Sequence, residues 1–325
     1  MKKILIDMLG GDYPERILEA MDKALKIDPT LEFILVGDKE KLGNRWEVIH
    51  STDSIGSDEA PTVVRTRKES SISIAAYALR DREDCGAFVS AGNTGAVLTA
   101  ATLIVGRIPG VLRPALCPSL PTLVEGVRVM IIDAGANMDS KPEYLVQFAI
   151  MGSEQMKTKG VESPRVALVN VGTEDNKGNE LTAATFIQLK QAHEAGKINF
   201  VGNMEANEMM SGKYDVIVCD GFVGNILLKT AEGSFRMLMS KVKGAFRKSI
   251  FAMIGGLMSK RQLMKLRALG SSAVGGSIFI GTKKPVVKAH GSASVTALVN
   301  AILVARDAAR SDLATRIEKA LENKG

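Results

Sequence analysis

The chain has 325 residues, a mass of 34.7 kDa and 46% hydrophobic residues, enough to bury a large core. Its three cysteines are far apart in the sequence, which argues against a disulfide framework and against a cysteine zinc site. The apolar stretch that follows Met1 is too short for a signal sequence. These features predict a soluble globular protein of the cytoplasm with reduced thiols.

The formal net charge of +6 is unevenly distributed along the chain. Residues 233–306 contain no Asp or Glu but 13 Lys and Arg residues, so the rest of the chain is acidic. Such asymmetry predicts an acidic partner, an anionic membrane surface or nucleic acid. Nucleic acid is disfavoured as a partner, because no aromatic residues alternate with the basic ones to stack on bases.

Short apolar runs alternate with helical patterns along most of the chain. The runs predict strands at residues 3–6, 32–36, 46–49, 86–90, 126–132, 165–169, 200–201, 214–219 and 286–287. Apolar spacing and caps predict helices that start at Pro14 with Asp12 as cap, at 70–80, 94–105 and 142–157, and at 225–242. This alternation predicts an α/β fold with a mainly parallel sheet flanked by helices and right-handed crossovers. No repeat or linker divides the chain, so we expect one catalytic unit over residues 1–325.

Several predicted strands end in turns made of Gly, Asn, Asp and small hydroxyl residues. The clearest turns are residues 7–12, 90–96, 133–137, 170–180 and 220–225. Glycine lets backbone amides approach a ligand closely, and a helix N-terminus offers unsatisfied N–H groups to an anion. A series of such turns along one chain predicts an anion pocket at the carboxyl edge of a parallel sheet.

Two of these turns hold candidate anion-binding groups. Gly92, Asn93 and Thr94 stand at the mouth of a predicted helix, where they would bind an anion or a carbonyl oxygen. The alternative is Asn93 in a left-handed turn with Thr94 as a simple cap. Asn137, which ends the turn 133–137, has the same two interpretations.

Three further positions carry groups suited to phosphate and acyl chemistry. Lys177 lies in a glycine-rich loop, where an ammonium beside backbone donors would hold phosphate, although a loop lysine is usually just solvated. Asn225 and Lys229 are one helical turn apart and could face one ligand. His290 follows the strand 286–287 and would serve as a general acid or base, or as a structural histidine bonded to a carbonyl.

Familiar catalytic devices are missing from the sequence. It has no G-x-x-x-x-G-K-[ST] loop, no G-x-G-x-x-G after the first strand, no G-x-S-x-G elbow and no metal-ligand spacing of His, Cys and carboxylates. We therefore expect no metal, no cofactor and no covalent nucleophile. Inorganic phosphate suits the remaining pocket, because it is already nucleophilic at neutral pH and needs only orientation and oxyanion stabilisation.

Residues 243–270 predict a protruding amphipathic helical pair. Its apolar tip, which would contact a membrane, consists of Ile250, Phe251, Ile254, Leu257 and Met258. Basic residues such as Arg247, Lys260 and Arg261 flank that tip, as an interfacial membrane-binding element requires. The alternative is a core or dimer-packing helix pair with solvated lysines.

The motifs in their order resemble those of the bacterial phosphate acyltransferases of phospholipid synthesis. They are residues 7–12, 90–96, 106–110, 113–114, 133–137, 141–143, 147–152, 177–180, 199–203, 220–225, 228–233 and 288–292. The resemblance covers nearly the whole chain. It departs from the family pattern at Met8 and Leu9, where Ala-Met is expected, and at Ala293, where a second Ser is usual.

The resemblance implies a fold like those of isopropylmalate dehydrogenase and phosphotransacetylase, in a homodimer without metal or dinucleotide. It implies reversible transfer of a long-chain fatty acyl group from acyl carrier protein to inorganic phosphate. The acyl phosphate product would feed a membrane glycerol-3-phosphate acyltransferase. The resemblance also implies a cytoplasmic protein that associates peripherally with the inner face of the cell membrane, which favours the membrane interpretation of 243–270.

Within this scheme we expect phosphate to attack the thioester carbonyl directly. Lys177, Asn225 and the amides of residues 92–94 would bind phosphate or the oxyanion. Asn137 and Lys229 would orient the site, and His290 would protonate the departing thiolate. One rival is a short-chain phosphotransacetylase that uses acyl-CoA. The other is a non-catalytic membrane- or nucleic-acid-binding protein.

Overall fold

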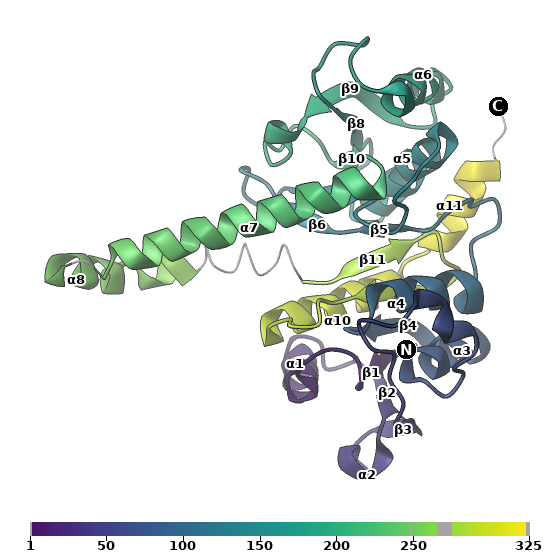
Figure 1. Cartoon of the computed structure of the whole chain (residues 1–325), viewed down its shortest axis with the longest axis vertical. Helices are drawn as coiled ribbons and strands as arrows, with labels where there is room; N and C mark the ends of the chain where they lie inside the picture. Colours follow the sequence, from purple (N-terminus) through teal and green to yellow (C-terminus); the bar gives the residue numbers. More distant parts are fainter. Residues whose placement is uncertain (1, 248, 265–274, 323–325) are drawn as a thin grey trace.

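The computed structural model describes residues 2–247, 249–264 and 275–322, and the strands in these ranges form two sheets (Figure 1). The larger sheet has the order β3 (Glu47–His50), β2 (Phe33–Gly37), β1 (Lys3–Asp7), β4 (Cys85–Ser90), β12 (Val286–Lys288), β11 (Ser277–Ile280) and β5 (Ala115–Cys117). The smaller sheet has the order β6 (Ser119–Pro121), β7 (Arg128–Ile132), β10 (Val216–Val218), β8 (Arg165–Asn170) and β9 (Asn199–Glu205). Among the strand pairs of these sheets, β11 pairs antiparallel with β12 and β5, and β6 pairs antiparallel with β7. The other pairs are parallel, so the predicted mainly parallel character is confirmed.

Helices connect the strands and cover both sheets. They are α1 (Pro14–Ile27), α2 (Lys39–Leu42), α3 (Ser71–Asp81), α4 (Thr94–Ala100), α5 (Pro142–Lys157), α6 (Glu180–Glu194), α7 (Gly221–Ala245), α8 (Ile250–Met258), α10 (Val295–Arg310) and α11 (Leu313–Glu322). Short 3-10 segments occupy Pro61–Arg65 and Ala206–Glu208, and α4 continues into a π-helical turn, Ala101–Val105. The predicted helix 94–105 therefore has the right extent but two geometries.

The predicted start of α1 at Pro14 is confirmed, but its predicted cap and the predicted start of α7 need correction. Asp12 does not cap α1, because the N-cap position is Tyr13 and its side chain makes no capping hydrogen bond. Helix α7 begins at Gly221 and not at Asn225, since the Asp220 side chain accepts a hydrogen bond from the Val223 amide and caps the helix four residues earlier. Asn225 thus lies in the second turn of α7.

A continuous hydrophobic core links the two sheets. One cluster of buried side chains contains Ile4 and Ile278 from the larger sheet together with Met130, Val166 and Val216 from the smaller one. All three cysteines are free and buried, which confirms the predicted core thiols. The sheets therefore share a core although their strands do not pair with each other.

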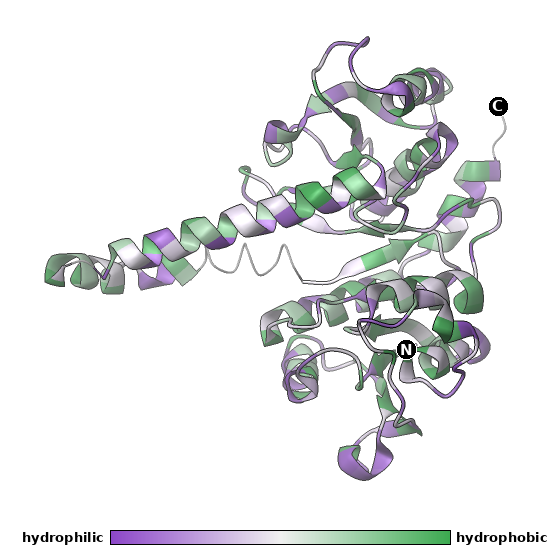
Figure 2. Ribbon diagram, viewed as in Figure 1, coloured by the Kyte–Doolittle hydropathy of each residue, from purple (hydrophilic) through white to green (hydrophobic). Residues whose placement is uncertain are grey.

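Helix α7 projects away from both sheets and carries α8 at its far end (Figure 1). At 25 residues it is roughly 37 Å long. Figure 2 shows that α8 is mostly hydrophobic, and its Phe251 and Ile250 side chains are 87% and 75% exposed. No helix in the described part of the chain is both long and apolar enough to cross a bilayer. The end of the predicted pair, 265–270, lies outside the described residues.

Candidate active site

Three turns meet at the carboxyl edge of the larger sheet. They follow β1, β4 and β12, three strands that are parallel neighbours. The Ala289 amide donates to the Ser90 carbonyl at 2.9 Å, and the Asp12 amide donates to the Gly291 carbonyl at 3.0 Å. At Gly10 an added Cβ would lie 2.6 Å from the Gly92 nitrogen, so glycine is required for this close approach of two backbones.

The buried carboxyl of Asp7 organises these turns. It accepts hydrogen bonds from the Leu9 and Gly10 amides at 3.1 Å and from the Ser90 hydroxyl at 2.7 Å. Burial raises the pKa of Asp7, and these hydrogen bonds oppose that rise. The Gly92 amide donates to the Ser90 Oγ at 3.0 Å. The prediction that the Gly92 amide contacts the anion therefore loses support, because this group already has a partner inside the protein.

Asn93 is the N-cap of α4. Its Oδ1 accepts a hydrogen bond from the Ala96 amide at 3.0 Å, and its Nδ2 donates to the Gly56 carbonyl at 2.8 Å. The left-handed alternative for Asn93 is wrong, since its φ is −54°. The Asn93 side chain thus fixes the helix start, and the free first-turn donors of α4 belong to the backbone of Thr94 and Gly95.

In the smaller sheet, the turn after β7 is built around another buried carboxyl, Asp133. Its oxygens accept hydrogen bonds from the amides of Leu116 at 2.8 Å and Asn137 at 2.6 Å. Burial raises the pKa of Asp133, and those backbone hydrogen bonds oppose the rise. The Asn137 Nδ2 donates to the Pro114 carbonyl at 2.9 Å and to Asp133. Asn137 therefore holds the turn in shape with its side chain.

The same turn packs against the start of α7. The Gly221 amide donates to the Asn137 carbonyl at 2.8 Å, and an added Cβ on Gly135 would lie 3.6 Å from the Asn225 Cβ. The turn that carries Asn137 therefore lies against the part of α7 that carries Asn225. Lys229 follows Asn225 by one turn of α7 and is exposed.

His290 faces α7 from the turn after β12. Its Nδ1 contacts the Ser292 amide at 3.2 Å and the Ser292 hydroxyl at 3.0 Å. Burial raises the pKa of Glu232 on α7, and the charges of His290, Arg236 and Lys229 oppose that rise. His290 and Lys229 therefore both lie close enough to Glu232 for their charges to act on its pKa. Sequence reasoning missed Glu232, although its position three residues after Lys229 places both on one helix face.

Lys177 stands apart from the other predicted site residues. It lies in the exposed loop after β8, where its Nζ is 3.9 Å from a Glu174 carboxylate oxygen. Within the described residues, no hydrogen bond or ion pair joins its side chain to the turns described above. The Asn170 Nδ2 donates to the Lys177 carbonyl at 2.9 Å, so the base of its loop is tied to the end of β8.

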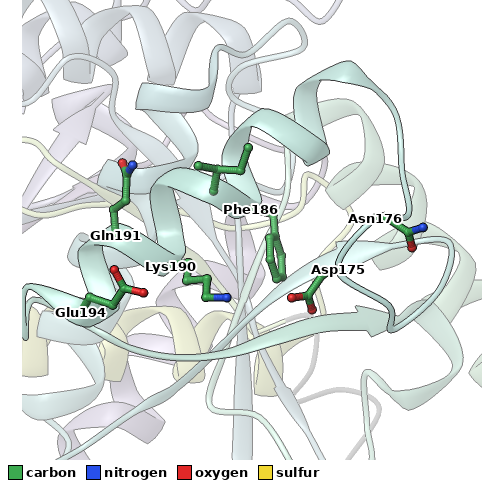
Figure 3. Close-up of a pocket in the computed structure, with 7 residues that line it drawn as sticks. Asp175, Asn176, Phe186, Lys190, Gln191 and Glu194 are labelled. Carbon is green, nitrogen blue, oxygen red and sulfur yellow. The ribbon is translucent and has the colours of Figure 1, made fainter.

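A cavity of about 340 Å³ opens beside the same loop (Figure 3). Its lining comes from α6 and from the loop, and consists of Asp175, Asn176, Phe186, Ile187, Lys190, Gln191 and Glu194. None of the predicted site residues lines it. The cavity has an open, mixed apolar and charged wall, and its chemistry differs from that of the glycine and asparagine turns.

Comparison with known proteins shows the family to which this chain belongs. A family model described as "Fatty acid synthesis protein" matches residues 2–316. The phosphate acyltransferase of Bacillus licheniformis is 44% identical over 338 residues, covering 99% of each chain. The phosphate acyltransferase of Halalkalibacterium halodurans is 42% identical over 328 residues, covering 97% of this chain and 95% of that protein. The chain belongs to this family of phosphate acyltransferases.

Solved structures of more distant proteins share the fold. A phosphotransacetylase from Streptococcus pyogenes has a TM-score of 0.62 at 17% identity, covering 95% of this chain and 94% of that one. A branched-chain phosphotransacylase from Enterococcus faecalis V583 has a TM-score of 0.60 at 15% identity, covering 95% and 99%. An isocitrate dehydrogenase from Methylococcus capsulatus has a TM-score of 0.50 at 11% identity, covering 99% of both chains. These likenesses confirm the predicted fold class.

The candidate groups lie on different elements. The first-turn amides of α4 and the turn with His290 lie at the carboxyl edge of the larger sheet, whereas Asn225 and Lys229 lie on α7, which follows β10 of the smaller sheet. Backbone and amide donors of this kind stabilise anionic oxygens, and an imidazole can transfer a proton.

Proposed function

We propose that this phosphate acyltransferase moves a long-chain fatty acyl group from acyl carrier protein to inorganic phosphate, reversibly, for phospholipid synthesis. The observation that carries the proposal is membership of the phosphate acyltransferase family, and the proximity of His290 and Lys229 to Glu232 of α7, whose pKa their charges lower, supports it. Family membership supplies phosphate as acceptor. The relatives at 42–44% identity favour this function over a short-chain phosphotransacetylase, since the phosphotransacetylase from Streptococcus pyogenes shares only the fold, at 17% identity.

In the proposed reaction, a phosphate oxygen forms a bond with the thioester carbonyl carbon and the carbon–sulfur bond breaks. The electron pair leaves with sulfur, and His290 donates a proton to the departing thiolate. Asn225 and the backbone amides of Asn93 and Thr94, at the N-cap and the first position of α4, would bind phosphate or the oxyanion. Lys229 would orient the phosphate, and Asn137 would act through the backbone turn that it holds in shape.

In this scheme, Lys177 can reach the phosphate only after a conformational change. Its exposed loop carries three glycines or asparagines around the lysine, and its side chain has only a long ion pair with Glu174. We therefore propose that Lys177 reaches the phosphate when its loop closes over bound substrate.

Variants of Lys177 and Asn225 test the roles proposed for these residues. Lys177→Ala and Asn225→Ala should each lower kcat/KM for phosphate, measured as free carrier thiol released from palmitoyl carrier protein. Normal turnover by both folded variants would contradict the scheme. The donor is tested on the unaltered protein, where palmitoyl carrier protein should react and acetyl-CoA should not. Preference for acetyl-CoA would instead support a short-chain phosphotransacetylase.

The protruding pair 243–270 would hold the single catalytic unit of residues 1–325 at the inner face of the cell membrane. The apolar tip of α8 is exposed, and Lys260 and Arg261 beside it carry the positive charge that anionic lipid attracts. There the product would be consumed by a membrane glycerol-3-phosphate acyltransferase. We also propose a homodimer, because α7 exposes a series of apolar side chains along its length: Phe222, Ile226, Met237 and Leu238.

Flotation with vesicles of anionic phospholipid tests the membrane role. Phe251→Glu combined with Leu257→Glu should abolish binding to the vesicles, while catalysis in solution persists. Leu123→Glu is the matched control, since Leu123 is 86% exposed but lies outside the predicted helical pair 243–270, so this variant should leave binding intact. Charge reversal at Lys260 and Arg261 separates two uses of the basic segment. Loss of vesicle binding indicates lipid contact, and loss of carrier-protein kinetics indicates docking of the acidic carrier.

A further inference from the structure

Lys288 ends β12 in a row of three polar residues across the larger sheet. Ile6 of β1 pairs with Val89 of β4, and Ser90 pairs with Lys288. Asp7, Ser90 and Lys288 are therefore the last residues of three neighbouring parallel strands. They lie at the edge where the turns after β1, β4 and β12 meet, and where a ligand of this class of sheet binds.

The Lys288 side chain is partly buried, and its ammonium has no ion-pair partner within the described residues. Its Nζ donates one hydrogen bond, to the carbonyl of Ala289. Within the described residues, no carboxylate lies within ion-pair distance of this nitrogen. Two of its three N–H donors therefore remain unused.

Burial lowers the pKa of Lys288 to about 8, and the charge of Asp7 opposes that shift. Asp7 on β1 is the charged group that acts on this ammonium from a neighbouring element, and His290 follows in the same turn. The oxygens of Asp7 are already engaged by Leu9, Gly10 and Ser90. The negative charge of Asp7 thus favours the protonated form of Lys288 without a direct contact. Asp7 accepts no hydrogen bond from the Lys288 ammonium.

A partly buried cation with unused donors becomes more favourable when an anion accepts hydrogen bonds from those donors. Titratable groups with shifted pKa values are for this reason frequent at functional sites. Lys288 donates its hydrogen bond to the carbonyl of Ala289, the residue before His290. The amide of the same Ala289 donates to the Ser90 carbonyl. The ammonium therefore lies in the turn that also carries the proposed acid and beside the turn that begins α4.

We propose that Lys288 is a further phosphate-binding cation of this enzyme, and that the ligand completing its surroundings is inorganic phosphate. The inference rests on the proposed function and adds a contact from the larger sheet. Phosphate held by Lys288 would lie between the α4 amides and the His290 turn. The phosphate group of the carrier-protein arm has the same chemistry, so the experiment must separate the two sources.

Calorimetric titration of the full chain with inorganic phosphate tests the inference without depending on turnover. Lys288→Met should weaken phosphate binding at pH 7 at least tenfold, while Lys288→Arg should retain it. In the unaltered protein, phosphate binding should weaken between pH 8 and 9.5 as Lys288 loses its proton, and Lys288→Arg should lack that loss. Lys283→Met is the control, because Lys283 is an exposed lysine just before the amino end of β12.

Steady-state kinetics then distinguish the possible failures. The inference predicts a raised KM for phosphate in Lys288→Met with an unchanged KM for acyl carrier protein. A change confined to the carrier-protein KM, or phosphate affinity equal to that of the unaltered protein, would overturn it. If the unaltered protein binds phosphate through Lys288 but forms no acyl phosphate, the proposed function fails and the phosphate site stands.

Discussion

Gly224 tests whether the contact between α7 and the Asp133 turn positions the site. A Cβ added at Gly224 would overlap the carbonyl oxygen of Asp133 and lie 2.9 Å from the Cys219 Sγ. In an open helix, Gly→Ala stabilises by about 1 kcal/mol through helix propensity. At Gly224, by contrast, the added Cβ would collide with the backbone carbonyl oxygen of Asp133, which lies in a turn held by buried hydrogen bonds. Overpacking of this kind costs about 3 kcal/mol at the upper end of its usual range, so the net loss should be about 2 kcal/mol.

Gly233 is the matched control, because it lies in the same helix and an added Cβ would meet no atom within 4 Å. Gly233→Ala should therefore stabilise by about 0.5–1 kcal/mol. Thermal unfolding followed by circular dichroism should show Gly224→Ala about 3 °C below the unaltered protein. Its kcat should fall too, since Asn225 moves with the helix. A Gly224→Ala protein as stable as Gly233→Ala would refute the steric reasoning.

Two further predictions concern Asp215 and the His290 environment. Burial alone would raise the pKa of Asp215, but the hydrogen bonds and charge of Arg165 hold it below its ordinary value of 3.8. Asp215→Asn should lose roughly 1–3 kcal/mol at pH 7 by urea unfolding, and that deficit should disappear only as the pH falls below about 4, where the unaltered Asp215 becomes protonated. A deficit that persists at pH 2 would contradict this. His290→Gln should lower kcat by about 10²–10⁴-fold, and Glu232→Gln should lower it by less with the same KM for phosphate, measured as thiol release. Normal kcat in both would remove His290 from the mechanism.

The sequence predicted elements whose ends are marked locally. Pro142 and the apolar spacing after it gave the bounds of α5. Ser70 and Ser71 were both possible caps of α3 in the sequence, and the structure has Ser70 in that position. The turns at 133–137 and 220–225 were placed at strand ends for the same reason. The start of α7 was missed by four residues, because Asp220 serves both as the end of a turn and as a helix cap.

The remainder depends on contacts between distant parts of the chain. β5, β6 and β11 have only three or four residues each and are strands because they pair antiparallel with long-range neighbours. The amino-acid composition does not show where one sheet ends and the other begins, since one core cluster spans both sheets. Lys288 and Glu232 were visible in the sequence, but their chemistry comes from Asp7 and His290, which only folding brings near.

Direct attack by phosphate on the thioester is tested most directly in a single turnover. The enzyme, in excess over palmitoyl carrier protein, is mixed with and without inorganic phosphate, and free thiol and acylated species are measured over time. Direct attack predicts thiol release only when phosphate is present, with one palmitoyl phosphate formed for each thiol and no acylated enzyme. Stoichiometric thiol release without phosphate, accompanied by acylated enzyme, would contradict it.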